Sequence, residues 1–279
     1  SQATQKIAEY IKISNRFISI IIKSTVVPGT TIRYVNSILE KITEKKIGEY
    51  GLGMNPEFLR EGSAIFDFMN PDRVVIGYED EKTKLICDKI YSKWDCKKIH
   101  CNTATAEMIK YSNNVLLATL ISLNNELANL SSMIGGIDYS DVIEGVISDG
   151  RWSVKDSNGK INHPTVIEYF KPGIGFGGSC FPKDVEAIRT HGNNLQLPMR
   201  ILNSVLDVNA EQIEFTLNLL TKKIPNIIDK NVLVLGITFK PNTDDLRQSS
   251  SIRMIEKLKN KVNSIAVHDP VGLESFFSN

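Results

Sequence analysis

The sequence is poor in cysteine and tryptophan, and it has almost no net charge. Its 279 residues include four cysteines and two tryptophans, and the formal net charge at pH 7 is +1. So few cysteines in a chain of this length do not suggest a disulfide framework. A nearly neutral chain without a long basic block gives no indication of nucleic-acid binding. We therefore expect a globular protein of the cytoplasm, where thiols stay reduced.

Long apolar runs and metal-ligand clusters are also missing. No run reaches the roughly 18 apolar residues of a membrane span, and no signal peptide opens the chain, so we expect no membrane association. Cys96, His100 and Cys101 lie close together, but they lack a second ligand pair at zinc spacing. We expect no bound metal.

One run is rich in both glycine and chemically active residues: Gly173-Ile-Gly-Phe-Gly-Gly-Ser-Cys-Phe-Pro-Lys-Asp184. Its glycines allow tight backbone turns, and Pro182 suits the first turn of a helix. Cys180 is therefore predicted just before a helix N-terminus, where the macrodipole favours the thiolate. We interpret Cys180 as a nucleophile with Lys183 and Asp184 as charged helpers. The alternative is a buried structural cysteine after a flexible loop.

The same run contains G-x-G-x-x-G, the spacing of a dinucleotide-binding fingerprint. That fingerprint follows a buried strand, whereas Lys171-Pro172 precedes it here, so we reject this interpretation. A P-loop is excluded because no G-K-[ST] closes the run.

The first hundred residues alternate between buried strands and helices, which predicts a parallel α/β sheet. Strands are expected at 17–23, 51–54 and 73–77, with helices at 4–13, at 29–44 and after a cap at Asn55. Parallel sheets bind ligands at the carboxyl ends of their strands, where Thr25 and Glu57 stand. The alternatives are a turn role for Thr25 and a helix-start preference for Glu57.

A long helix is predicted from Thr103 to Ile134, ended by Gly135-Gly136. Lys110 and Asn114 are four residues apart, so both project from one face of it. A lysine on a largely apolar helix is either used in a pocket or extends into solvent. The tail then predicts a strand at 231–239, a polar loop at 240–247, a serine-capped helix at 249–258 and a strand at 264–267.

With these motifs the chain resembles the UDP-glucose 6-dehydrogenases within the UDP-glucose/GDP-mannose dehydrogenase family. The resemblance spans almost the whole chain. It is carried by 23–29 (KSTVVPG), 55–62 (NPEFLREG), 71–77 (PDRVVIG), 106–114 (AEMIKYSNN), the cysteine loop and 239–247 (FKPNTDDLR). It implies two partial Rossmann-like parallel-sheet domains joined by a helical central domain. The expected boundaries are 1–101 for the NAD-binding part, 102–210 for the central and dimerisation domain with the cysteine, and 211–279 for the UDP-sugar-binding part.

The resemblance also implies a reaction. UDP-glucose is oxidised to UDP-glucuronate with two NAD⁺ in succession, through a thiohemiacetal and then a thioester on Cys180. Lys110 would stabilise the oxyanion with help from Asn114, Asp184 and Thr25 would position water, and Glu57 would be the base in thioester hydrolysis. Thr25, Glu61 and Arg247 would approach NAD. The UDP-sugar site would comprise Leu59, Lys110, Asn114, Lys171, Phe181, Phe239 and Lys240, and the long helix would form a homodimer.

The chain departs from the family pattern at both ends. It begins after the place of the family's N-terminal glycine fingerprint, and its second sheet stops after Asp269. The 279 residues alone are therefore expected to be inactive. The alternatives are a GDP-mannose or UDP-N-acetylhexosamine dehydrogenase, or a non-catalytic nucleotide-sugar-binding fragment.

Overall fold

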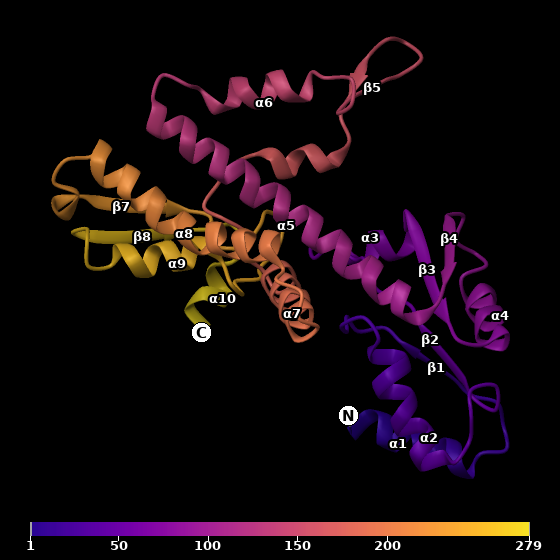
Figure 1. Ribbon diagram of the computed structural model, residues 1–279. Coiled ribbons are helices and arrows are strands. Elements are labelled where there is room, and N and C mark those ends of the chain that lie inside the picture. Colours follow the sequence, from indigo (N-terminus) through magenta and orange to yellow (C-terminus); the bar gives the residue numbers. More distant parts are fainter. Residues whose placement is uncertain (1, 279) are drawn as a thin grey trace. The chain divides into compact units, whose positions relative to one another are not determined.

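The structure, a computed structural model, describes residues 2–278 and consists of two compact units. The first unit ends at Asn113 and the second begins at Asn114, so the boundary falls inside the long helix α5 (Thr103–Ile134; Figure 1). No helix in the described range is long and apolar enough to cross a membrane.

A four-stranded sheet forms the centre of the first unit. Its strands, in spatial order, are β1 (Ser19–Ile22), β2 (Gly51–Met54), β3 (Arg73–Tyr78) and β4 (Lys97–Cys101). The β1–β2 and β3–β4 pairs are parallel, whereas β2 and β3 are antiparallel. The expected α/β class is confirmed, and the antiparallel pair is a difference from the all-parallel sheet that the alternation suggested. The only helix between β2 and β3 is α3 (Ala64–Met69), which is about 9 Å long at 1.5 Å per residue. A helix this short does not carry the chain back to the other end of the sheet, so β3 starts at the end where β2 stops and runs antiparallel to it.

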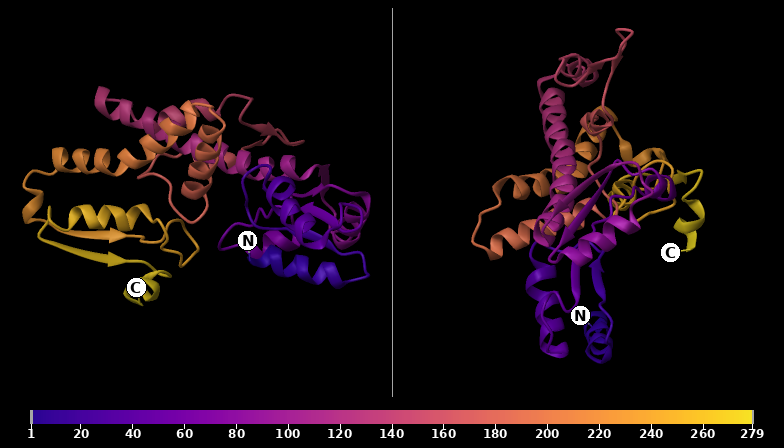
Figure 2. Two further views of the ribbon diagram at one scale, coloured as in Figure 1. Left: turned by 60° about the horizontal axis from the view of Figure 1, so that its bottom comes forward. Right: turned by 90° about the vertical axis from the view of Figure 1, so that its right-hand side faces the viewer.

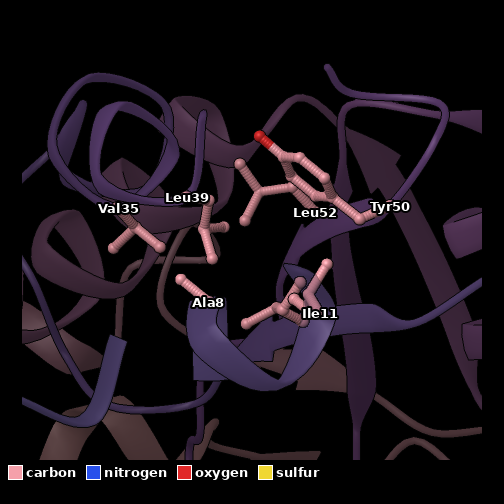
Figure 3. Close-up of a cluster of buried hydrophobic side chains, with 7 residues drawn as sticks. Ala8, Ile11, Val35, Leu39, Tyr50 and Leu52 are labelled. Carbon is pink, nitrogen blue, oxygen red and sulfur yellow. The ribbon is translucent and has the colours of Figure 1, made fainter. Parts of the chain in front are cut away.

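Helices cover the two faces of this sheet. On one face, α1 (Gln2–Ile13), the π-helical segment η1 (Thr30–Val35) and α2 (Asn36–Thr43) supply buried side chains that meet Tyr50 and Leu52 (Figure 3). On the other face, Cys87 of α4 (Glu81–Ile90) packs with Val74 and Ile76.

The sequence of β2 explains why α4 lies so close to the sheet. Leu52 and Met54 are fully buried on the face opposite to Gly51 and Gly53, as strand alternation requires. A Cβ atom on Gly51 would lie 2.0 Å from Thr83 Oγ1 of α4, so only glycine allows this contact.

Two helix predictions in this unit were inaccurate. The helix expected at 29–44 is split into η1 and α2. The prediction of a helix directly after Asn55 was wrong, because no helix forms between β2 and Ala64. Asn55 does not act as a helix cap; its Nδ2 donates instead to the carbonyl of Val75 at 2.7 Å, across the sheet.

The second unit contains the remainder of α5, further helices and two two-stranded sheets, β5–β6 and β7–β8. Its elements are α6 (Tyr139–Ile147), β5 (Val154–Lys155), β6 (Ile161–Asn162), η2 (Thr165–Phe170), α7 (Phe181–Asn194), α8 (Arg200–Lys223), η3 (Ile227–Asp229), β7 (Asn231–Leu235), α9 (Ser250–Leu258), β8 (Ser264–His268) and α10 (Leu273–Ser278). Strands β7 and β8 pair in parallel, and α9 lies between them and α8 (Figure 2). Ile213 and Leu217 of α8 bury against Leu258 of α9. The serine cap of α9 is confirmed, because Ser249 Oγ accepts the N–H of Ile252.

Candidate functional site

In the first unit, the carboxyl ends of β1 and β2 are joined by polar side chains. Lys23 Nζ donates to Asn55 Oδ1 at 2.6 Å, and the hydroxyl of Tyr91 donates to the same oxygen at 2.5 Å. Burial lowers the pKa of Lys23 from its ordinary value, although the Glu57 carboxylate opposes this shift. Half-buried Thr25 and Glu57 each follow this pair by two residues, so both stand at the sheet edge where α/β proteins bind ligands.

A fully buried carboxylate holds the loop that follows β1. Glu107 of α5 accepts the backbone N–H of Gly29 at 2.6 Å and, with its other oxygen, the N–H and hydroxyl of Thr31 at 2.8 and 2.6 Å. Gly29 has φ of +90°, which favours glycine at this position. The loop that carries Thr25 is therefore fixed at its far end.

The loop that follows β2 is held by Asp67 of α3. This carboxylate accepts the backbone N–H of Arg60 at 2.8 Å and its guanidinium at 2.6 and 3.0 Å. The Arg60 side chain holds the pKa of Asp67 at about 2, against desolvation by burial. Within the same loop Glu57 accepts the N–H of Leu59, whose side chain is exposed, and half-buried Glu61 follows.

Lys110 is buried, with 6% of its surface exposed. Its ammonium lies 5.3 Å from the ring centroid of Phe58, a cation–π contact. Within its own unit, residues 2–113, Nζ makes no hydrogen bond or ion pair. The alternative that Lys110 extends into solvent is therefore wrong, and its use in a pocket stays a prediction.

In the second unit, Cys180 is the N-cap residue of α7, with Pro182 the second residue of the helix. The predicted place of the thiol at a helix start is confirmed. The residue is exposed, and its sulfur lies 3.7 Å from Ser179 Oγ. The alternative of a buried structural cysteine is therefore wrong.

Asp184, one turn into α7, is buried and doubly held. Asn114 Nδ2 of α5 donates to its Oδ2 at 2.6 Å, and the ammonium of Lys183 forms an ion pair with its other oxygen. The structure thus brings together two of the predicted site residues, Asn114 and Asp184, from segments seventy residues apart.

The glycines of the cysteine loop allow close approach to other parts of this chain. A Cβ on Gly177 would lie 2.0 Å from the carbonyl oxygen of Gln248, and one on Gly178 would lie 2.6 Å from the Phe239 ring. Gly178 N–H donates to the carbonyl of Arg247 at 3.0 Å. The loop and the segment after β7 therefore interlock, which places Phe239 and Arg247 beside the cysteine loop.

An open hollow of about 460 Å³ lies between these two segments. It is lined by Gly178, Ser179, Pro182, Lys183, Arg247 and Gln248. Both of its cations are engaged, since Lys183 pairs with Asp184 and Arg247 Nη2 pairs with Asp245 at 2.8 Å. Lys240 Nζ lies 5.4 Å from the ring centroid of Phe239.

The other two predicted residues of this unit differ in their surroundings. Phe181 packs edge-on against the buried Phe176, with ring centroids 6.1 Å apart. Lys171 is exposed and forms an ion pair with Glu168 at 2.7 Å.

Comparison with known proteins gives a consistent result along the chain. The models of the UDP-glucose/GDP-mannose dehydrogenase family match in chain order: the NAD binding domain over residues 1–95, the central domain over 104–211 and the UDP binding domain over 233–278. The UDP-glucose 6-dehydrogenase AglM of Haloferax volcanii is 36% identical over 92% of this chain. The chain belongs to the UDP-glucose/GDP-mannose dehydrogenase family.

Solved structures of this family have the same fold. A UDP-glucose dehydrogenase from Pyrobaculum islandicum matches 99% of this chain at 36% identity, with a TM-score of 0.86. A UDP-D-ManNAc dehydrogenase from Pyrococcus horikoshii matches 97% at 27% identity, with a TM-score of 0.79. The chain spans 57% of the length of the Haloferax relative, and 60% and 61% of these two structures.

The NAD binding domain match identifies NAD as the cofactor, and the first unit fits this dehydrogenase cofactor. The joined carboxyl ends of β1 and β2 form a polar edge beside Thr25, which is where nucleotides bind in such sheets. Among residues 2–278, no group of three or more histidine, cysteine or acidic side chains is placed to hold a metal ion.

Several residues that hold the candidate site were not predicted from the sequence. Lys23 and Glu107 lie inside the recognised motifs, and Asp67 lies between two of them, but pattern alone gave them no role. Asn209 and Gln212 lie three apart on α8, and both are buried. Two amides at helical spacing on the apolar face of a helix could have predicted such a role, because a buried amide requires hydrogen-bond partners.

Proposed function

We propose that this chain is the substrate-oxidising part of a UDP-glucose 6-dehydrogenase. The observation that carries the proposal is Cys180, an exposed thiol at the N-cap of α7 beside the buried Asp184, in a chain 36% identical to a UDP-glucose 6-dehydrogenase. A helix N-terminus stabilises a thiolate, the form that attacks an aldehyde.

The proposed reaction converts the sugar CH₂OH to a carboxylate in four electrons. When bound, NAD⁺ accepts one hydride in each of two oxidations. Between them the Cys180 sulfur adds to the aldehyde carbon to give a thiohemiacetal, which the second oxidation converts to a thioester. Water then cleaves the C–S bond, which returns the thiol. In sum, the alcohol, two NAD⁺ and one water give the carboxylate, two NADH and three protons.

Each remaining residue has a proposed role that suits its surroundings. The buried ammonium of Lys110 would stabilise the oxyanion, since a charge shielded from water acts strongly. Asn114 orients Asp184, which would position water with Thr25, and Glu57 would be the base in thioester hydrolysis. Thr25, Glu61 and Arg247 would hold NAD. The UDP-sugar would contact Leu59, Lys110, Asn114, Lys171, Phe181, Phe239 and Lys240.

We propose further that the protein is a cytoplasmic homodimer. A thiol nucleophile must stay reduced, and this condition is met in the cytoplasm. Apolar side chains along α5 remain exposed, among them Leu116, Leu127, Leu130 and Met133, and a second copy would bury them. Sedimentation equilibrium of the protein and cell fractionation test the two statements.

The test of the function uses the enzyme that carries this chain, with UDP-glucose and NAD⁺. We expect two NADH per UDP-glucuronate formed, and a covalent adduct on Cys180 in acid-quenched samples analysed by mass spectrometry. Cys180→Ser should abolish carboxylate formation while UDP-glucose still binds. Faster oxidation of GDP-mannose or a UDP-N-acetylhexosamine would contradict the substrate, and full turnover by Cys180→Ser would contradict the mechanism.

A further inference from the structure

Amide side chains from α5 and α8 surround the start of the cysteine loop. Gly173 N–H donates to Asn125 Oδ1 at 2.8 Å, and Gln212 Nε2 donates to the Gly173 carbonyl at 2.8 Å. Gln212 is itself oriented by Asn129 of α5, whose Nδ2 donates to Gln212 Oε1 at 2.8 Å. Both backbone groups of Gly173 are thus held by two different helices.

Three residues further along, a single side chain holds both backbone groups of Phe176. Asn209 Oδ1 accepts the Phe176 N–H at 2.7 Å, and Asn209 Nδ2 donates to the Phe176 carbonyl at 3.2 Å. A side-chain amide has an acceptor oxygen and a donor NH₂ group side by side. It can therefore form with Phe176 the two hydrogen bonds that the backbone of a neighbouring strand would form. A Cβ on Gly175 would lie 2.6 Å from Asn209 Oδ1, so the glycine makes room for this contact.

These amides are buried, which makes their hydrogen bonds important. Asn125 is 0% exposed, Gln212 4% and Asn209 6%. The loop they hold is rich in glycine and would otherwise have many backbone conformations. Beyond Phe176, contacts of Gly177 and Gly178 with the segment after β7 continue the restraint up to Ser179 and Cys180.

We propose that Asn209 and Gln212, with Asn125, are positioning residues for Cys180. They fix the backbone at 173 and 176 so that the sulfur is presented at the N-terminus of α7. This proposal rests on the proposed role of Cys180 as the nucleophile. The amides act through the loop, and they need not touch a substrate.

The test compares Asn209→Ala with Asn218→Ala, a matched control at an exposed position of the same helix. The first readout needs no substrate: the rate at which iodoacetamide alkylates Cys180 at pH 7, followed by mass spectrometry in the full chain. We expect at least a threefold slower rate in Asn209→Ala, because a released loop lets the sulfur leave the N-terminus of α7, and helix N-termini in general favour the thiolate that iodoacetamide alkylates. Asn218→Ala should react like the wild type.

Two internal measurements separate positioning from loss of the fold. Cys87 is 1% exposed, so its labelling reports global opening and should stay negligible in both variants. If Asn209→Ala does label at Cys87, Asn209→Asp replaces it, because this variant keeps the acceptor for the Phe176 N–H. Hydrogen exchange of 171–180 should quicken in the variant used, while α8 keeps its protection.

The second readout is the activity of the enzyme that carries this chain. We expect kcat to fall at least tenfold in Asn209→Ala, with KM for UDP-glucose within about threefold of the wild type. Unchanged alkylation, or a loosened loop with normal kcat, would overturn the proposal. A wild type that does not oxidise UDP-glucose would instead overturn the proposed function, and the alkylation rates would still decide whether Asn209 positions the thiol.

Discussion

The substitution Glu107→Gln tests whether the buried carboxylate of Glu107 holds the loop after β1. Glu107 is 0% exposed and accepts three hydrogen bonds of 2.6 to 2.8 Å from Gly29 and Thr31. Glutamine has nearly the same shape, but it has one acceptor oxygen and one NH₂ group. The substitution therefore changes the hydrogen bonding and leaves the packing almost untouched.

The expected cost follows from these bonds. In either orientation of the amide, the NH₂ group replaces an acceptor that faces a backbone N–H, so at least one charge-assisted bond of about 1.5–3 kcal/mol is lost. The bonds that remain go to a neutral oxygen and weaken by up to about 1 kcal/mol in total. We expect Glu107→Gln to destabilise this loop by about 2–4 kcal/mol.

Hydrogen exchange measured on peptides covering 24–36 is the appropriate assay, because it reports this loop alone. A change of about 2–4 kcal/mol corresponds to roughly 30- to 900-fold faster exchange where the loop opens locally. Glu126→Gln is the matched control, since Glu126 is exposed on the same helix. Equal exchange in Glu107→Gln and the wild type would refute the reasoning that this carboxylate holds the loop.

Three further predictions concern other parts of the two units. Gly177→Ala should lower the melting temperature, because its Cβ would lie 2.0 Å from the Gln248 carbonyl oxygen, whereas Gly173→Ala, with nothing within 4 Å, should melt like the wild type. The Arg60 side chain holds the pKa of Asp67 at about 2, below its ordinary 3.8, so this pair stabilises the fold above about pH 4 and the stabilisation is lost as the pH falls toward 2. Urea unfolding should therefore separate Asp67→Asn from the wild type at pH 7 and bring them together near pH 2; a constant difference would contradict the assignment. Lys110→Met should lower kcat on the order of 10²- to 10³-fold if the ammonium stabilises an oxyanion, and unchanged turnover in steady-state assays would show that it does not.

Much of the local structure could be predicted from the sequence. The helix Thr103–Ile134 and the strand Gly51–Met54 were predicted with their observed bounds. Such elements are determined by short-range features: an apolar period, a glycine pair that ends a helix, a proline in a first turn. The place of Cys180 at a helix start was predictable for the same reason.

Features that depend on distant partners were not predictable. Strand β4 was missed because Lys97–Cys101 contains few apolar residues and is recognisable as a strand only through its pairing with β3. Asn55 was taken for a helix cap, although its partners are Lys23, Val75 and Tyr91, none of them its neighbours in sequence.

The sequence by itself determined the family, the α/β class and the place of Cys180 at a helix start, because these depend on residue types in contiguous motifs. Tertiary structure alone decided that Lys110 is buried, that Asn114 holds Asp184, and that the glycines of the cysteine loop make room for Gln248, Phe239 and Asn209. The physical reason is that burial and hydrogen bonding depend on which segments meet in space. A chain pattern shows which groups need a partner, and only the folded chain supplies the partner.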